Sequence, residues 1–277
     1  VDEAHKRGLS IHAWINPMRG MNDTYIKAIS DKYLIKQWYN DDKKNGTYIS
    51  LVNGVWYCNP AYKEVRDMIT NGAKEILSKY NVDGIHIDDY FYPTTEKSFD
   101  AAAFAQSKSN NLTQWRLDTV STMVKELYSG IKSVNPTALF GVSPQGNINN
   151  NYSTQYADVK KWCSQSGYLD YIVPQIYFGF KNKYQPYQTN MNSWCAMVTA
   201  PNVKMVVGLA PYKIGTADNT GEWQNDANIL ARQVETFKNS GKYGGAAFFR
   251  YESIFKPAAS VKNQVNNELA ALKEKLK

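Results

Sequence analysis

The 277-residue sequence predicts an α/β fold and, within that class, a (β/α)8 TIM barrel. Short and almost continuously apolar segments, typical of buried parallel strands, alternate with segments of helical periodicity. The connections before the strands are short, whereas those after them are long and rich in polar and aromatic residues. No glycine-rich phosphate loop follows a strand, as a doubly wound nucleotide-binding sheet would require.

Six segments have the apolar character of buried strands: residues 10–15, 83–88, 138–143, 171–176, 204–209 and 245–249. A complete barrel has eight strands, and the first residues of the chain resemble the end of a helix. We therefore expect the first two β/α units to be absent from the given chain. The six strands would be the third to the eighth, and residues 1–277 would form a single domain that ends in a helix.

Four segments carry apolar residues at helical spacing and are predicted helices: residues 62–79, 113–134, 225–240 and 261–276. Two other segments interrupt the alternation of strands and helices. Residues 48–57 are predicted to form a hairpin, because Asn53-Gly54 suits a type I′ turn. Residues 94–111, rich in Ser, Ala and Asn, are predicted to be a long insertion after the second strand.

Composition and charge limit the kinds of partner and cofactor that the chain is expected to bind. The net charge is +7 and the calculated pI is about 9.0, but the basic residues are scattered, so no nucleic-acid-binding block is predicted. No apolar run approaches the ~18 residues of a membrane span, and a soluble protein is expected. Three Cys and three His, without ligand spacing, predict neither a disulfide scaffold nor a metal site, and no cofactor motif is present. The sequence leaves the oligomeric state open.

Aromatic residues make up 13% of the chain, and many stand beside Asn, Gln and Gly in expected loops. Aromatic faces next to amides suit sugar rings, which present apolar C–H faces and hydroxyl edges. A glycan is therefore the expected ligand, although any single Tyr could equally pack the protein surface.

Asp88 and Asp89 end the second predicted strand, and strand alternation places His86 and Asp88 on one face. Two adjacent carboxylates repel each other, which raises one pKa, so that one acid can donate a proton while the other stays ionised. Glycoside hydrolysis needs this division of labour. The structural alternative is that one aspartate caps the next segment or binds Arg19.

Other residues after the strands are predicted to contact the substrate: Asn16, Arg19, His86, Tyr92, Gln145, Asn147, Gln175, Tyr177, Tyr212 and Arg250. Both arginines could instead form structural ion pairs, and the histidine could be a core residue.

Glu252 is a third candidate catalytic residue, as the second carboxylate of a pair. Asp218 and Glu222 are loop alternatives, and Glu222 equally suits a helix start. Asp83 and Asp170 fall at strand starts and are predicted turn or cap residues.

Three segments carry a resemblance to a known family: residues 13–19 (AWINPMR), 83–93 (DGIHIDDYFYP) and 174–177 (PQIY). Together they resemble the bacterial family called glycosyl hydrolase-like 10, along nearly the whole chain. The resemblance implies a (β/α)8 barrel, a location in the cell envelope or outside the cell, and a glycosidase activity. At least one relative is understood to cut peptide-free peptidoglycan strands. The family normally begins with two further β/α units.

The segment around Asp88 is also similar to the DGxDxDxE strand motif of family 18 chitinases. Asp83-Gly84 and Asp88 match that motif, but His86 replaces an Asp, and Tyr90 stands where the acidic Glu would be. This departure argues against ordinary chitinase chemistry.

The consecutive Asp88-Asp89 pair is similar instead to the pair in O-GlcNAc hydrolases. That similarity implies substrate-assisted, retaining cleavage of an N-acetylhexosamine linkage. Asp88 would orient the 2-acetamido group, Asp89 would donate the proton, and Tyr177 would touch the acetamido group.

Three alternatives stay open. A conventional two-carboxylate glycosidase would use Asp88 as nucleophile and Glu252 or a loop acid as its partner, with a carboxyl separation of ~5 Å for retention or ~6.5–9.5 Å for inversion. A catalytically silent barrel would bind glycans through its aromatic residues alone. A metal-dependent deacetylase is the weakest alternative, because three His cannot easily build its site.

Overall fold

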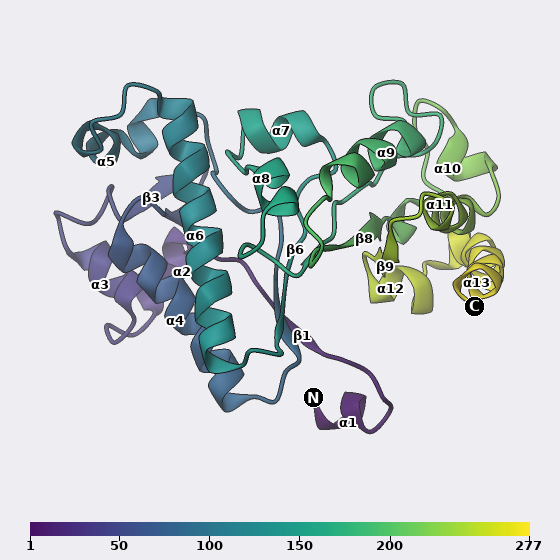
Figure 1. The fold of residues 1–277 in the computed structure, drawn as a ribbon, viewed down its shortest axis with the longest axis horizontal. Helices are drawn as coiled ribbons and strands as arrows, with labels where there is room; N and C mark the ends of the chain where they lie inside the picture. Colours follow the sequence, from purple (N-terminus) through teal and green to yellow (C-terminus); the bar gives the residue numbers. More distant parts are fainter. The chain divides into compact units, whose positions relative to one another are not determined.

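The computed structural model describes residues 1–277, which form two compact units. Unit 1 comprises residues 1–142 and 149–170, and unit 2 comprises residues 143–148 and 171–277. Each unit contains parallel strands and several helices (Figure 1), which confirms the predicted α/β class. A single domain over residues 1–277 stays a prediction.

Unit 1 is built on three parallel strands, in the order β1-β5-β6. Their bounds are His12–Ile15 for β1, Gly84–Ile87 for β5 and Leu139–Val142 for β6. Each lies inside a predicted strand and is two residues shorter than predicted. Ile15 is opposite Ile87, which in turn is opposite Val142, so the three carboxyl ends are level with one another.

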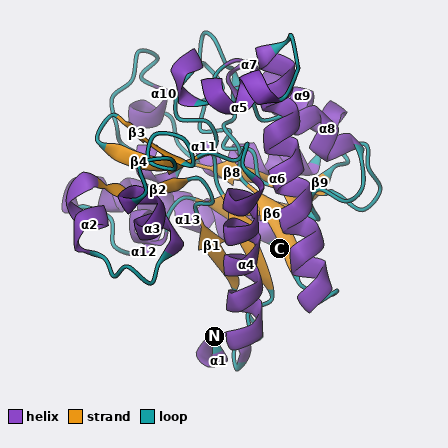
Figure 2. Cartoon of the chain, turned by 90° about the vertical axis from the view of Figure 1, so that its left-hand side faces the viewer, coloured by secondary structure: helices purple, strands orange, loops and turns teal.

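Helices α4 (Lys63–Lys79) and α6 (Leu112–Val134) run side by side along this sheet (Figures 1 and 2). Both were predicted to within one residue at each end. They bury apolar stripes at helical spacing, made of Val65, Ile69 and Ala73 in α4 and Val120, Met123, Val124, Leu127 and Ile131 in α6. The helices come close where Gly130 of α6 faces Thr70 of α4.

A small antiparallel sheet follows β1, with strand order β2-β4-β3. Its elements are β2 (Arg19–Asn22), α2 (Asp23–Ala28), α3 (Leu34–Asn40), β3 (Ile49–Val52) and β4 (Val55–Cys58). The predicted hairpin is confirmed, and both turn residues have positive φ, 48° at Asn53 and 77° at Gly54, as a type I′ turn requires. Strand β2 was not predicted, because its four residues show no apolar alternation.

The remaining helices of unit 1 are short. They are α1 (Asp2–His5), η1 (Lys97–Phe99), α5 (Ala101–Gln106) and α8 (Val159–Ser164), and α7 (Ile148–Ser153) begins at the boundary between the units. Two of them, η1 and α5, lie in the predicted insertion at residues 94–111. That insertion is therefore ordered, and partly helical.

Unit 2 contains the parallel strands β7 (Tyr171–Ile172), β8 (Lys204–Leu209) and β9 (Tyr243–Phe248), in that order. Strand β8 has the predicted bounds. The predicted strand 171–176 keeps only two residues, because Pro174 has no N–H to donate to the ladder. Pairing resumes at Gln175 through single bridges to Gln145 and Gly208.

The helices of unit 2 are α9 (Tyr187–Met197), η2 (Pro211–Lys213), α10 (Glu222–Asn225), α11 (Ile229–Lys238), α12 (Tyr251–Phe255), η3 (Ala259–Val261) and α13 (Lys262–Leu276). The predicted helix 225–240 begins too early, because Asp226 is extended and Asn228 is left-handed, with φ 57°. The C-terminal helix starts one residue later than predicted. No helix of the chain is both long and apolar enough to cross a membrane.

The contact between α4 and α6 gives a matched pair of glycine substitutions. A Cβ at Gly130 would lie 2.3 Å from Cγ2 of Thr70, whereas a Cβ at Gly72 would have no atom within 4 Å. Gly130→Ala is expected to lower the free energy of unfolding by about 1–3 kcal/mol. Gly72→Ala, on an exposed helix interior, should raise it by about 0.5–1 kcal/mol. Urea denaturation measures both values, and equal effects of the same sign would contradict this packing.

Candidate active site

The carboxyl edge of the unit 1 sheet brings two predicted site residues together. Asn16 follows β1 and Asp88 follows β5, and the parallel register places them side by side. Asn16 Nδ2 donates a 2.6 Å hydrogen bond to Asp88 Oδ1. The sequence prediction that these two strand ends converge is confirmed, and the amide fixes the orientation of the Asp88 carboxylate.

Asp88 is buried, with 5% of its surface exposed. Burial raises the pKa of the Asp88 carboxyl above its ordinary value, and the neighbouring Asp89 raises it further. Hydrogen bonds from Asn16, from the Tyr90 backbone and from the Trp14 side chain oppose that rise in pKa. The result is an acid with a raised pKa beside a second carboxyl group. Burial contributes more to that rise than the repulsion between carboxylates on which the sequence prediction rested.

Asp89 is half-buried and begins a tight turn after β5. The N–H of Phe91 donates to its backbone carbonyl at 3.0 Å, and Gln155 Nε2 donates to the same oxygen at 2.6 Å. Two hydrogen bonds to its carbonyl oxygen therefore hold the main chain of Asp89 in place.

Arg19 and Tyr90 form a second contact at this edge. The guanidinium carbon of Arg19 lies 5.2 Å from the centroid of the Tyr90 ring, in a cation–π arrangement. Whether Arg19 also binds Asp88 or Asp89 stays a prediction.

His86 is half-buried on β5, two residues before Asp88. Burial, together with the nearby His12, lowers the pKa of its imidazole to about 4. His86 is therefore neutral at pH 7 and adds no positive charge beside the carboxylates. A direct contact between His86 and a substrate stays a prediction.

Tyr92 was predicted to bind substrate, and the structure contradicts this. The side chain is 3% exposed and packs edge-on against Phe99 and Tyr156 at 5.4 and 5.2 Å. The Arg116 guanidinium carbon lies 5.2 Å from its ring centroid. Tyr92 is a core residue beneath the loop, because the chain turns inward two residues after Tyr90.

Unit 2 holds the other predicted substrate-binding residues. Gln145 and Gln175 pair through their backbones, and Gln175 Nε2 donates to the Ser143 carbonyl at 3.0 Å. Asn147 is half-buried in the same segment as Gln145. A Cβ on Gly146 would lie 2.3 Å from the Gln175 carbonyl oxygen, so this close approach requires glycine. Because it donates to Ser143, the side-chain amide of Gln175 has a structural role. A substrate contact for Gln145, Asn147 and Gln175 stays a prediction.

Tyr177 and Tyr212 belong to an aromatic cluster that also contains Phe249. The ring of Tyr177 is nearly parallel to that of Phe249, at 21° and 6.3 Å, and Tyr212 meets each of the other two rings edge-on. Lys213 Nζ donates to the Tyr177 carbonyl at 2.6 Å, and burial lowers the pKa of that amine. Tyr212 and Phe249 are exposed, and such rings can stack against the apolar face of a sugar.

Arg250 and Glu252 form an ion pair of 3.2 Å at the start of α12, and both side chains are more than half exposed. This pairing is the structural alternative for Arg250. An exposed pair contributes little to stability. Catalysis by Glu252 stays a prediction.

The loop acids of unit 2 have structural roles. Glu222 is fully buried at the start of α10, where its carboxylate accepts the backbone N–H groups of Phe180 and Lys181 at 2.8 and 2.9 Å. Of the two roles predicted for Glu222, the structure shows the one at the start of a helix. Asp218 accepts hydrogen bonds from Thr220 within its own turn.

The acids at the strand starts are structural, as predicted. Asp83 accepts the N–H of Ile11 at 2.7 Å, and Asp170 accepts the N–H of Phe140 at 2.7 Å.

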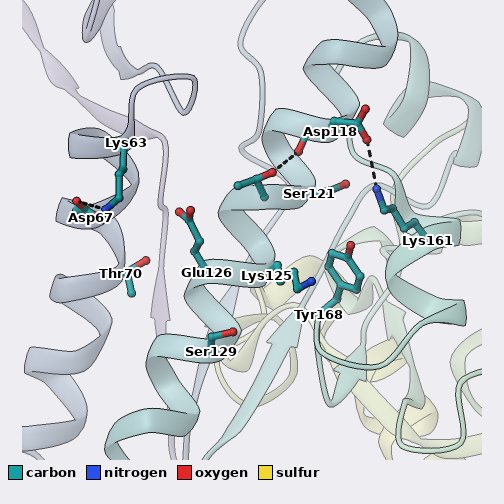
Figure 3. Close-up of a pocket in the computed structure, with 11 residues that line it drawn as sticks. Lys63, Asp67, Thr70, Asp118, Ser121, Lys125, Glu126, Ser129, Lys161 and Tyr168 are labelled. Carbon is teal, nitrogen blue, oxygen red and sulfur yellow. Dashed lines mark hydrogen bonds and ion pairs between the residues drawn. The ribbon is translucent and has the colours of Figure 1, made fainter. Parts of the chain in front are cut away.

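A groove of about 610 Å³ lies on the helices of unit 1 (Figure 3). Its lining residues come mainly from α4, α6 and α8: Lys63, Asp67, Thr70, Asp118, Ser121, Thr122, Lys125, Glu126, Ser129, Lys161 and Tyr168. The lysines Lys63 and Lys161 are paired with Asp67 and Asp118. None of the predicted site residues lines this groove, which belongs to the helix layer and not to the strand ends.

Several residues near the site were not predicted. Trp14 hydrogen-bonds Asp88, and strand alternation could have found it, because Trp14 and Asn16 share a face. Phe249 ends a predicted strand, as the other site residues do. Gln155 belongs to no motif or strand end, so no feature of the sequence identifies it. No three His, Cys, Asp or Glu side chains are grouped so as to hold a metal ion.

Comparison with known proteins identifies the family of the chain. The family model described as glycosyl hydrolase-like 10 matches residues 1–225, which include both aspartates and the aromatic residues Tyr177 and Tyr212. The chain belongs to the glycosyl hydrolase-like 10 family. The resemblance seen in the sequence is thereby confirmed.

Two curated relatives cover almost the whole chain. Glycosyl hydrolase YngK of Bacillus subtilis (strain 168) is 29% identical over 291 residues, with 97% of this chain and 55% of YngK aligned. Glycosyl hydrolase DigH of Escherichia coli (strain K12) is 30% identical over 285 residues, with 93% of this chain and 64% of DigH aligned. The chain thus spans between about half and two thirds of the length of these relatives.

Solved structures show a similar fold at low sequence identity. A chitinase from Rhizomucor miehei matches with a TM-score of 0.54 and 13% identity, over 99% of this chain and 84% of the chitinase. A glycoside hydrolase family 18 N-acetylglucosaminidase from Paenibacillus barengoltzii matches with a TM-score of 0.51 and 12% identity, over 78% and 77%. Both are TIM barrels, and the likeness concerns the fold alone.

The raised pKa of Asp88 predicts a pH-dependent effect on stability. A carboxyl whose pKa is higher in the folded state loses stability as the pH rises from its ordinary pKa through the raised one. Asp88→Asn cannot ionise, so its melting temperature relative to wild type is expected to be higher at pH 7 than at pH 4. Thermal denaturation at the two pH values measures the difference. A relative melting temperature that falls between pH 4 and pH 7 would show that ionised Asp88 stabilises the fold.

Proposed function

We propose that the chain is a glycoside hydrolase that cleaves an N-acetylhexosamine linkage with Asp88 and Asp89. The observation that supports this proposal is the buried Asp88, held by Asn16 and directly followed by a second carboxyl group at the end of a parallel strand. Adjacent carboxyl groups in different environments can divide the roles of acid and base. The names of the relatives, both glycosyl hydrolases, agree with the proposal.

The proposed mechanism is substrate-assisted and proceeds with retention. Asp88 accepts the N–H of the 2-acetamido group, whose carbonyl oxygen attacks the anomeric carbon, while Asp89 protonates the departing glycosidic oxygen. Water then attacks the anomeric carbon, its proton passes to Asp89, and the acetamido group leaves the anomeric carbon. The anomeric carbon is inverted twice, so the product keeps the configuration of the substrate.

Substrate binding assigns the proton within this pair. Burial raises the pKa of Asp88 in the free protein. An acetamido N–H donated to Asp88 favours its ionised form and lowers that pKa. In the proposed complex Asp88 is therefore ionised, and Asp89 carries the proton that it must deliver.

The aromatic cluster of Tyr177, Tyr212 and Phe249 supports a sugar ligand, because two of its rings are exposed. The match to a chitinase and an N-acetylglucosaminidase in fold is consistent with an acetamido sugar. We propose a (β/α)8 barrel as the complete fold, a bacterial cell-wall-type glycan such as peptidoglycan as the substrate, and a location in the cell envelope or outside the cell.

Mass spectrometry of new reducing ends tests the function. Wild-type protein is expected to cleave N-acetylglucosamine oligomers or peptide-stripped peptidoglycan, and to leave a neutral glucan intact. Asp89→Asn removes the proton donor, and Asp88→Asn removes the charged acceptor that orients the acetamido group. Each is expected to lower kcat by at least ~100-fold. Asp83→Asn, at the opposite end of the same strand, is the matched control and should stay within about threefold of wild type.

Turnover by Asp89→Asn at the wild-type rate would contradict the assignment of the acid. Binding of the oligomers without any cleavage by wild type would indicate a glycan-binding barrel instead. Cleavage that depends on Glu252 and not on Asp89 would indicate the conventional two-carboxylate mechanism.

A further inference from the structure

Gln155 holds the turn that carries Asp89 at two points. Its side-chain Nε2 donates to the Asp89 carbonyl oxygen at 2.6 Å, and its own backbone carbonyl accepts the N–H of Tyr92 at 3.4 Å. The Asp89 carbonyl also accepts the N–H of Phe91. One residue thus contacts both ends of the four-residue segment from Asp89 to Tyr92, and so constrains the peptide that follows Asp89.

The segment that contains Gln155 is itself firmly anchored. The next residue, Tyr156, is buried and left-handed, with φ 51°, and its hydroxyl accepts a 3.0 Å hydrogen bond from Arg116. Arg116 is fully buried and forms two 2.7 Å hydrogen bonds with the Asp100 carboxylate. A bidentate arginine–carboxylate pair has defined geometry, so the anchor of Gln155 is rigid.

This position has a cost in stability. The Oε1 atom of Gln155 is buried and has no hydrogen-bond partner. An unsatisfied buried oxygen lowers the stability of the folded state, and an apolar side chain of similar shape would remove that penalty. A glutamine here is therefore poorly explained by stability alone, whereas the donor on its other side-chain atom contacts the backbone of Asp89.

We propose that Gln155 is a positioning residue for Asp89, an inference that rests on the proposed glycosidase function. Its hydrogen bond fixes the Asp89 main chain, and so the direction from which the Asp89 carboxyl approaches the glycosidic oxygen. A displaced general acid slows proton transfer but leaves the sugar contacts unchanged. The effect of losing the bond therefore falls on kcat and not on KM.

The test compares Gln155→Met with wild type on the N-acetylglucosamine oligomers. Methionine has a similar shape, lacks the donor and removes the unpartnered oxygen. We expect kcat to fall at least ~10-fold and KM to stay within about threefold, with a melting temperature equal to or above that of wild type. Gln37→Met is the matched control, because Gln37 also donates to a backbone carbonyl, that of Asp31, and its loss should leave kcat unchanged.

Hydrogen–deuterium exchange of the Phe91 and Tyr92 amides is measured alongside, and should be faster in Gln155→Met. Gln155→Asn keeps an amide but is too short to reach Asp89, so it should show the same loss of kcat. This variant replaces Gln155→Met in the test if the methionine variant does not fold. Wild-type kcat in a folded variant would overturn the positioning role. An inactive wild-type protein would instead refute the proposed function, and the exchange data would still show whether Gln155 holds the turn.

Discussion

The parallel pairing of β5 with β1 on one side and β6 on the other fixes where the two aspartates lie. That pairing depends on Gly84, because a Cβ there would lie 2.4 Å from the Leu139 carbonyl oxygen and 2.9 Å from the His12 ring. With the strands this close, the register sets Asn16 beside Asp88 at the carboxyl edge. The chemistry proposed for the site follows from this register, since a shift of one residue would turn Asp88 to the opposite face.

The same geometry gives the carboxylate its unusual environment. Asp88 is buried at the end of β5, so its carboxylate loses solvation and gains only a few hydrogen bonds in return. Two features lower the stability of the fold near pH 7: the raised pKa of Asp88 and the buried Oε1 atom of Gln155, which has no hydrogen-bond partner. Both lie within a few residues of Asp89 in space or sequence, and sites that trade stability for function commonly show such features.

The sequence was informative where the physical pattern is local. Buried parallel strands are continuous apolar runs, so strand 204–209 was predicted with its observed bounds, and the acids after the second strand were placed correctly. Pro174 shortened another strand through a missing donor that the apolar pattern alone does not show. Tyr92 was assigned wrongly to the substrate site, because an aromatic residue after a strand looks the same in sequence whether it faces solvent or core. Gln155 contacts Asp89 from 66 positions away, and only tertiary structure reveals that contact.

Proton NMR of the anomeric signals during cleavage tests the central claim most directly. Paired oligomers of N-acetylglucosamine and of its de-N-acetylated counterpart would be followed from the first turnovers. If Asp88 acts through the acetamido group, the acetylated oligomer is cleaved with retention of configuration, and the de-N-acetylated oligomer is not cleaved. Inversion of configuration, or equal cleavage of both oligomers, would contradict the account.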